Sequence, residues 1–203
     1  MAGLGLASVS QAQLINASFE EPVMAQGSWG TAGLPGWTNG SGDTGAWNIP
    51  SSSFFVAEAP HGTQIGYSNS IQVAQQSSVG LIEGLNEVTV MGGRRQDSFA
   101  GSFDLQLWVG GTVVNGTVIG GEMLSSTSFV HTTIPVSSFT LISTSFTAAA
   151  NDPRLGQLLT VRFFKTSGSQ MNWDDVRMSA VPEPMTMVGL GAFALLLRRR
   201  KKA

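Results

Sequence analysis

The carboxylates near the C-terminal end of the chain are the first candidates for chemistry. Asp174 and Asp175 are adjacent, and the alternation of a β-strand points adjacent side chains to opposite faces. They therefore do not form the carboxylate pair that glycoside hydrolysis requires. Asp174 shares its predicted face with Val176 and Met178, which are expected in the core. Its carboxylate is then buried and needs either a cation or several hydrogen-bond donors.

Other residue types exclude several kinds of site. The chain has no cysteine, which excludes disulfides, thiol catalysis and Cys-ligated metals. Its two histidines, His61 and His131, argue against a multi-histidine metal centre, and no nucleophile-elbow pattern accompanies them. The glycine-rich stretch 92–95 lacks the Lys and the following Ser or Thr of a phosphate-binding loop.

Aromatic side chains in loops suggest a sugar-binding surface, because sugars stack on aromatic rings while polar groups read their hydroxyls. Segment 24–63 is rich in Gly, Ser and Asn, contains three of the five tryptophans and is expected to form loops. Trp37 is expected in the core, and Trp47 fits either the core or a ligand site. Trp108 lies on the polar face of its strand, either as a platform or under another layer. The predicted ligand-binding residues are Trp29, Trp47, Gln64, Arg94 and Trp108.

Strand and turn signals dominate between residues 13 and 180, where no stripe of helical length occurs. Apolar Phe103, Leu105, Leu107 and Val109 alternate with more polar residues, the period of a strand with one buried face. Turn pairs follow, and further strand-like runs complete the pattern. The turns are Gly110–Gly111 and Asn115–Gly116, and the later runs are 139–146, 158–165 and 171–179. We predict an all-β, jelly-roll β-sandwich over 13–180.

Charge argues against nucleic-acid binding. The 203 residues, enough for one domain, include 13 acidic and 11 basic residues, and five of the basic ones are consecutive at 198–202. The remaining body is acidic and has no basic face to gather phosphates. Only 12% of residues are charged, which excludes a coiled coil and a charge-rich disordered chain.

The C-terminal end has the pattern of a short transmembrane helix. Residues 185–197 carry no charge and precede the basic cluster. A full span takes about 20 apolar residues, so a transient anchor with a cytoplasmic basic end is expected. The prolines of Pro182-Glu183-Pro184 keep the preceding segment extended and open to a processing enzyme.

The order of these three elements over 181–203 resembles the PEP-CTERM sorting signal of Gram-negative bacteria. The elements are the Pro182-Glu183-Pro184 tripeptide, the apolar span 185–197, and a basic end with Arg198, Arg199 and Arg200. The resemblance implies an exosortase as partner, transient anchoring in the inner membrane, cleavage, and release to the cell surface or an exopolysaccharide matrix. The alternative is an ordinary tail anchor with a chance tripeptide.

Residues 1–12 are consistent with export. Leu4, Leu6 and Val9 fit the end of a signal-peptide core, and Ser10-Gln11-Ala12 fits a cleavage site. We expect a partial signal peptide here, with cleavage after Ala12. The alternative is a leader without a targeting role.

The body resembles the galactose-binding-like jelly rolls, which include several carbohydrate-binding modules. The matching stretches are 16–20, 34–37, 62–64 and 173–178. This resemblance implies a structural Ca²⁺ site that joins the first and last strands, with Glu20 and Asp174 as its carboxylates. The alternative is that Asp174 caps main-chain amides or pairs with an arginine.

Three functions follow from these patterns. The first is a non-catalytic, exported protein of the cell surface or matrix that binds polysaccharide. The second is a purely structural matrix protein. The third is an enzyme similar to the cyanobacterial indole-alkaloid cyclases, which share the Ca²⁺-containing jelly roll. A flat aromatic strip would favour sugar binding, whereas an apolar pocket lined by Tyr67, Phe99 or tryptophans, with a buried carboxylic acid, would favour the cyclase.

Overall fold

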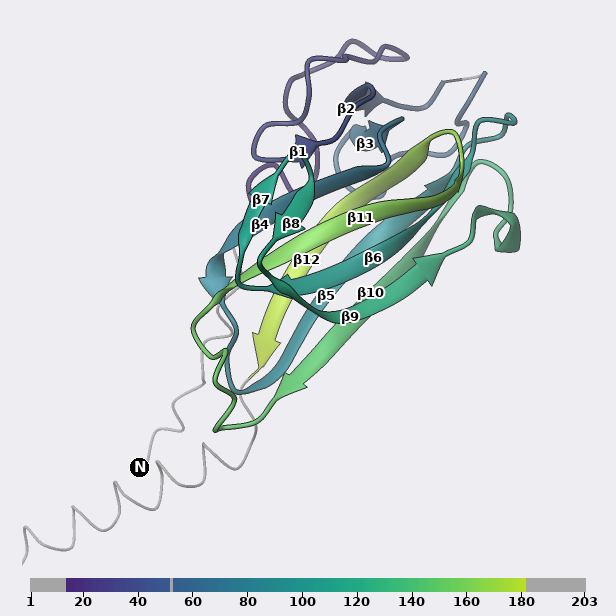
Figure 1. The fold of residues 1–203 in the computed structure, drawn as a ribbon. Coiled ribbons are helices and arrows are strands. Elements are labelled where there is room, and N and C mark those ends of the chain that lie inside the picture. Colours follow the sequence, from purple (N-terminus) through teal and green to yellow (C-terminus); the bar gives the residue numbers. More distant parts are fainter. Residues whose placement is uncertain (1–13, 52, 182–203) are drawn as a thin grey trace, which may run out of the picture.

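The computed structural model describes residues 14–51 and 53–181, which form a sandwich of two antiparallel sheets (Figure 1). The first sheet, in spatial order, consists of β1 (Thr38–Asn39), β4 (Gln72–Gly80), β11 (Leu158–Gly168), β6 (Gly101–Val109) and β9 (Glu122–Phe129). The second consists of β10 (Ser138–Ala148), β5 (Gly84–Arg94), β12 (Met171–Val181), β3 (Gln64–Ser68) and β2 (Thr44–Asn48).

The chain crosses repeatedly between the two sheets. Strands β4, β6, β9 and β11 lie in the first sheet and β5, β10 and β12 in the second, so that the chain changes sheet at each step from β4 to β6 and again from β9 to β12. This crossing pattern is typical of a jelly roll. The prediction of an all-β sandwich is confirmed.

A small hairpin and one helical turn complete the described elements. The hairpin consists of β7 (Thr112–Val114) and β8 (Thr117–Ile119), and the 3-10 helix η1 spans His131–Thr133. Asn115 and Gly116 join β7 to β8 with φ angles of 48° and 71°, the left-handed values that a type I′ turn requires. The turn predicted from the Asn-Gly pair is confirmed.

The main core lies between the sheets. Phe103, Leu105 and Leu107 of β6 are fully buried, as their alternation predicts. Phe163 of β11 stacks on Trp173 of β12 with ring centroids 4.6 Å apart, and this contact joins the two layers. Burying aromatic side chains contributes most of the hydrophobic stabilisation of such a core.

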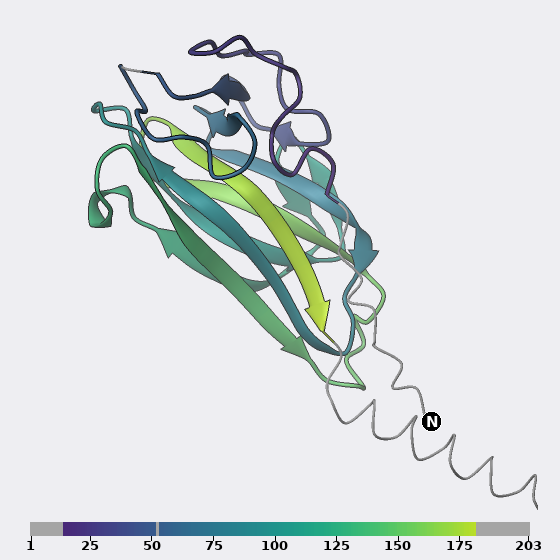
Figure 2. The same ribbon diagram turned by 180° about the vertical axis from the view of Figure 1, so that it is seen from behind.

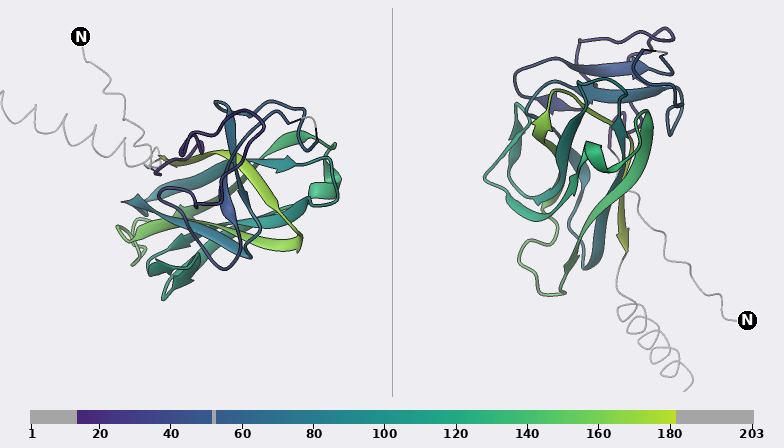
Figure 3. Two further views of the ribbon diagram at one scale, coloured as in Figure 1. Left: turned by 90° about the horizontal axis from the view of Figure 1, so that it is seen from above. Right: turned by 90° about the vertical axis from the view of Figure 1, so that its right-hand side faces the viewer.

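A second hydrophobic cluster lies on the outer face of the second sheet. A β-carbon at Gly66 of β3 would meet Trp173, so Gly66 faces the main core while its neighbours Ile65 and Tyr67 face away. Ile65 and Tyr67 pack with Trp47 and Phe55 into a cluster separate from the main core. The segment from β2 to β3 lies over this end of the sandwich (Figures 2 and 3).

The predicted orientation of Asp174 is wrong. Trp173 and Val176 both belong to the main core, although simple alternation would place them on opposite faces. The register of β12 against β5 shifts between Asp174 and Arg177, and Asp175 has a φ angle of 51°. This bulge turns the carboxylate of Asp174 away from the core face of Val176. Asp174 is nevertheless fully buried, as expected.

Several predicted segments lie outside the described residues. They are the partial signal peptide 1–12, the tripeptide 182–184, the apolar span 185–197 and the basic end 198–202. Within 14–51 and 53–181, no helix is long and apolar enough to cross a membrane.

Candidate ligand pocket

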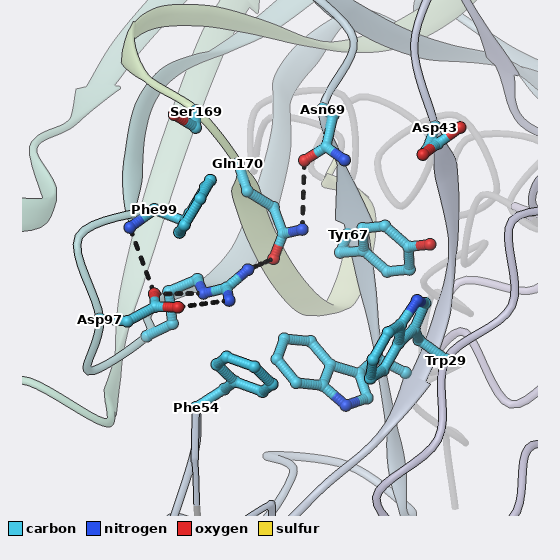
Figure 4. Close-up of a pocket in the computed structure, with 11 residues that line it drawn as sticks. Trp29, Asp43, Phe54, Tyr67, Asn69, Asp97, Phe99, Ser169 and Gln170 are labelled. Carbon is cyan, nitrogen blue, oxygen red and sulfur yellow. Dashed lines mark hydrogen bonds and ion pairs between the residues drawn. The ribbon is translucent and has the colours of Figure 1, made fainter.

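A cavity of about 380 Å³ opens at the end of the sandwich where β2 and β3 meet the β5–β6 and β11–β12 connections (Figure 4). Its aromatic lining consists of Trp29, Trp47, Phe54, Tyr67 and Phe99. Its polar lining consists of Asp43, Asn69, Arg95, Asp97, Ser169 and Gln170. Aromatic rings combined with polar groups that can orient a ligand are common in small-molecule sites.

The aromatic rings hold one another in edge-to-face contacts. Trp47 is buried and packs against Trp29 at 6.1 Å, Phe54 at 5.4 Å and Tyr67 at 6.4 Å between centroids. Trp29 is 55% exposed. Because Trp47 fixes its neighbours, the rings form a preorganised wall with the outermost face open to solvent.

Arg95 is the cation of the pocket. It is buried, and its guanidinium lies 4.7 Å from the ring of Phe54, 5.3 Å from that of Trp47 and 5.5 Å from that of Phe99. Its Nε and Nη2 each lie 2.6 Å from one carboxylate oxygen of Asp97. This two-pronged ion pair compensates the charge that burial would otherwise make costly.

A row of side-chain amides continues from Arg95 into the sheet. Arg95 Nη1 donates a hydrogen bond to Gln170 Oε1, and Gln170 Nε2 donates to Asn69 Oδ1 at 3.1 Å. Asn172, fully buried on β12, donates from Nδ2 to the same Gln170 oxygen at 3.2 Å. These bonds fix the orientation of the guanidinium inside the pocket.

The opposite side of the pocket carries Tyr67 and Asp43. Tyr67 donates its hydroxyl to the main-chain oxygen of Gly30 at 2.9 Å. Burial, together with the nearby charge of Asp43, raises the pKa of Tyr67 to about 12. The hydroxyl is therefore protonated at neutral pH, and its proton is directed to the protein main chain.

The predicted calcium carboxylates lie around the segment that precedes β3. Glu20 Oε1 accepts hydrogen bonds from the amides of Thr63 and Gln64 at 3.0 Å each, and Glu20 Oε2 accepts from Thr63 Oγ1 at 3.1 Å. Asp174 Oδ2 accepts from the amide of His61 at 2.8 Å, and its Oδ1 accepts from the amide of Asp175 at 2.6 Å. Asp174 therefore caps main-chain amides, which is the alternative to a Ca²⁺ site that the sequence leaves open.

Burial is the main cause of an unusual pKa at Asp174. It raises the pKa to about 8, against the two amide hydrogen bonds that lower it, and the charges of Asp175 and Glu20 raise it further. No described cationic side chain pairs with Asp174. A hard divalent cation bound by these carboxylates would compensate that charge, so the oxygen donors fit Ca²⁺ in chemistry. Within the described part of the chain, no group of three or more acidic, His or Cys side chains is placed to hold a metal.

Two of the five predicted ligand residues line the pocket, Trp29 and Trp47. Gln64 is buried elsewhere and donates to the main-chain oxygens of Phe19 and Pro22 at 2.9 and 3.1 Å. Arg94 donates to the main-chain oxygen of Ile134 at 2.6 Å. Of the two adjacent arginines, Arg95 lines the pocket, whereas the predicted Arg94 does not. Asp97, two residues after Arg95, is the signal in the sequence that could have identified it, because the two side chains form an ion pair.

Trp108 lies away from the pocket, in β6 of the first sheet. Its indole Nε1 donates to Gln106 Oε1 at 3.0 Å, and the guanidinium of Arg162 lies 5.7 Å from its ring. Phe164 contacts the same guanidinium at 4.9 Å. Trp108 is thus a partly buried member of an arginine-centred cluster on the other sheet.

The fold and the pocket define a β-sandwich protein with an aromatic-lined cavity at one end. The family model described as HpiC1 cyclase matches residues 10–179, and the chain belongs to this HpiC1-like family. No curated protein is similar enough in sequence to count as a match.

Solved structures share the fold. A Stig cyclase, Fisc from Fischerella sp. TAU, in complex with (3Z)-3-(1-methyl-2-pyrrolidinylidene)-3H-indole, is 22% identical with a TM-score of 0.68, covering 86% of this chain and 99% of that one. An apo cyclase from Fischerella sp. is also 22% identical, with a TM-score of 0.70 and coverage of 86% and 98%. A cyclase from Fischerella sp. TAU in complex with 4-(1H-indol-3-yl)butan-2-one is 21% identical, with a TM-score of 0.68 and coverage of 85% and 98%.

Family membership corrects the first interpretation of the sequence. The recognition of an exosortase substrate with a carbohydrate-binding body is wrong, because the matched family is that of the HpiC1 cyclases. The expected role as a non-catalytic matrix protein, with exosortase and polysaccharide as partners, is wrong for the same reason. The third function named from the sequence, a cyclase-like enzyme, fits the family and the aromatic pocket best.

Proposed function

We propose that this protein is an enzyme that binds a small, planar aromatic molecule in the pocket and closes a ring within it. The observation that carries the proposal is the aromatic cavity between Trp29 and Phe99, in a chain that belongs to a cyclase family. Two cyclase structures of the same fold contain indole compounds, which makes an indole the first substrate class to test.

The pocket residues suit such a reaction. Ring closure within one molecule is an isomerisation, so it needs no oxidant or second substrate. Its barrier falls when the substrate is held folded with its reacting atoms close together. Aromatic faces stabilise positive charge that develops during the reaction, and the buried rings of Trp47 and Tyr67 exclude water from it.

The charged residues have different roles in this proposal. Arg95 and Asp97 neutralise each other and brace Phe54 and Phe99, so they shape the pocket. Asp43 is the lining carboxylate without a hydrogen bond or ion pair among the described residues, which leaves it available to a ligand. Asp174 does not line the pocket.

We also propose a structural Ca²⁺ held by Glu20 and Asp174. The burial of Asp174 without a described cationic partner supports it. The ion would supply positive charge that keeps both carboxylates ionised and would tie the chain before β3 to β12. The pocket lies elsewhere, so its residues act without a contribution from this ion.

The test is ligand-dependent thermal melting with 4-(1H-indol-3-yl)butan-2-one as the probe. The wild-type protein is expected to melt at a higher temperature as the probe concentration rises. Trp29→Ala removes one wall of the pocket and should abolish most of the shift. Trp108→Ala on the other sheet is the matched control and should retain it. An equal shift in both variants, or no shift in the wild type at millimolar probe, contradicts the proposal.

A further inference from the structure

The two sides of the pocket differ in their available charge. In Figure 4, Asp97 lies on the side of the pocket with Phe54 and Phe99, and Asp43 lies on the opposite side, which also carries Tyr67 and Trp29. The charge of Asp97 is compensated by the Arg95 guanidinium at 2.6 Å. The carboxylate of Asp43 has no such partner among the described residues.

The cationic side chains close to the pocket, Arg95 and Lys165, already have hydrogen-bond partners other than Asp43. Arg95 is held by Asp97 and by Gln170. Among residues 14–51 and 53–181, Lys165 is the other cation that contacts the pocket lining, and its Nζ donates to the main-chain oxygens of Asn69 and Ser169 at 2.7 and 2.9 Å. Asp43 is solvent-exposed. It therefore presents a negative charge at the rim of an aromatic cavity.

Aromatic faces beside this carboxylate are themselves suited to a cation. Trp29 is 55% exposed, and the ring of Tyr67 also lines the cavity. The faces of such rings carry a negative electrostatic potential that attracts ammonium groups. A carboxylate and two aromatic rings at one rim act in the same direction, because each favours positive charge.

We propose that the pocket selects an aromatic amine, with the planar ring among the aromatic side chains and the protonated amine against Asp43. This inference rests on the proposed function and adds the charge of the ligand to it. The ammonium donates a hydrogen bond to the Asp43 carboxylate and lies close to the faces of Trp29 and Tyr67. The Arg95 side of the pocket receives the neutral end of the ligand, since a second cation there would meet the guanidinium.

The test compares two probes that differ in one group. Tryptamine carries a protonated amine at pH 7, whereas tryptophol has a neutral hydroxyl on the same indole and linker. Calorimetric titration of the full chain at low ionic strength is expected to show about three- to tenfold tighter binding of tryptamine. This size follows from one exposed charge pair and one cation–π contact. The preference should shrink as salt screens the pair.

Two variants identify the source of the preference. Asp43→Asn keeps the shape of the side chain and should bring the two affinities together, while the affinity for tryptophol stays within about twofold. Asp104→Asn, which alters a carboxylate on the first sheet that accepts a hydrogen bond from Ser128, is the control and should retain the preference.

Each outcome decides between the proposals. Equal binding of both probes by the wild type overturns the amine inference and leaves the aromatic-substrate function standing. A preference that survives Asp43→Asn also overturns it, because another group must then bind the amine. If neither probe binds, the aromatic-substrate function fails and the amine inference fails with it.

Discussion

Replacing Arg95 with methionine tests whether the ion pair inside the pocket holds it open. The substitution keeps an unbranched side chain of similar length but removes the guanidinium. Asp97 then loses both contacts of 2.6 Å, and the rings of Trp47, Phe54 and Phe99 lose their shared cation. Gln170 keeps the hydrogen bond from Asn172.

The size of the effect follows from burial. Removing one partner of a buried ion pair costs about 3–5 kcal/mol, because the other charge is left without compensation. The Arg95 side chain is 8% exposed and that of Asp97 is 24% exposed, so Asp97 recovers some hydration. We therefore expect Arg95→Met to lower the free energy of unfolding by about 3 kcal/mol, at the low end of that range.

A double variant separates the charge from the packing. In Arg95→Met with Asp97→Asn, no uncompensated charge remains, so the loss should fall to about half of that in the single variant. Urea denaturation at pH 7, followed by tryptophan fluorescence, measures the wild type, Arg95→Met, Asp97→Asn and the double variant. A loss below about 1 kcal/mol in Arg95→Met, or additive losses in the double variant, would refute this reasoning.

Three further predictions concern the carboxylates of Asp174 and Glu20 and the close contact between Gly45 and Gly30, next to Trp29. The raised pKa of Asp174, about 8, means that the folded protein keeps a proton that the unfolded chain releases. In chelator, the free energy of unfolding should therefore fall as pH rises from about 4 to 8, by at most about 1.4 kcal/mol per pH unit. Urea denaturation at several pH values should show a flatter slope for Asp174→Asn. Equal slopes for the wild type and the variant would contradict the assignment of this pKa to Asp174. Glu20→Gln should abolish the rise in melting temperature that Ca²⁺ causes in the wild type, while an undiminished rise would exclude Glu20 as a ligand. Gly45→Ala places a β-carbon 1.6 Å from the main-chain oxygen of Gly30, so the substitution should displace the neighbouring Trp29. Binding of the indole probe in the melting assay should then weaken. Unchanged binding would show that the pocket does not depend on this position of Trp29.

The periodicity of the sequence was sufficient to predict the β-sandwich, because strands and turns depend on neighbouring residues. The apolar core residues of β6, Phe103, Leu105 and Leu107, occupy alternate positions, and the Asn115–Gly116 turn has the left-handed geometry that this pair favours. Trp29 and Trp47 could be named as ligand residues because a glycine-rich segment with tryptophans is unusual in a core. Such patterns depend on neighbours in the sequence alone.

The remaining features depend on register and on distant contacts. Asp175 adopts a positive φ angle and shifts the strand, so the orientation of Asp174 could not follow from alternation. Arg95 comes directly after the end of β5, where the two-residue period no longer applies, and the prediction selected Arg94 instead. The pocket itself joins segments near residues 29, 67, 97 and 170, which only the crossing strands bring together.

The function first inferred was wrong for a related reason. The motifs at 16–20 and 173–178 carry a resemblance to carbohydrate-binding modules and to cyclases alike. These motifs indicate the fold, whereas side chains at the rim of the pocket determine which ligand binds. From the sequence, a pocket lined by Tyr67, Phe99 or tryptophans with a buried carboxylic acid was the mark of a cyclase. The structure contains the aromatic lining, whereas the buried Asp174 lies outside the pocket.

The position of the pocket has an evolutionary consequence. Its rim is assembled largely from connections, including the β5–β6 and β11–β12 turns and the segment before β2, while the sheets contribute its floor. Connections accept insertions and substitutions more readily than paired strands do. Related chains can therefore acquire new substrates through changes at these turns, while the strand register and the main core stay as they are.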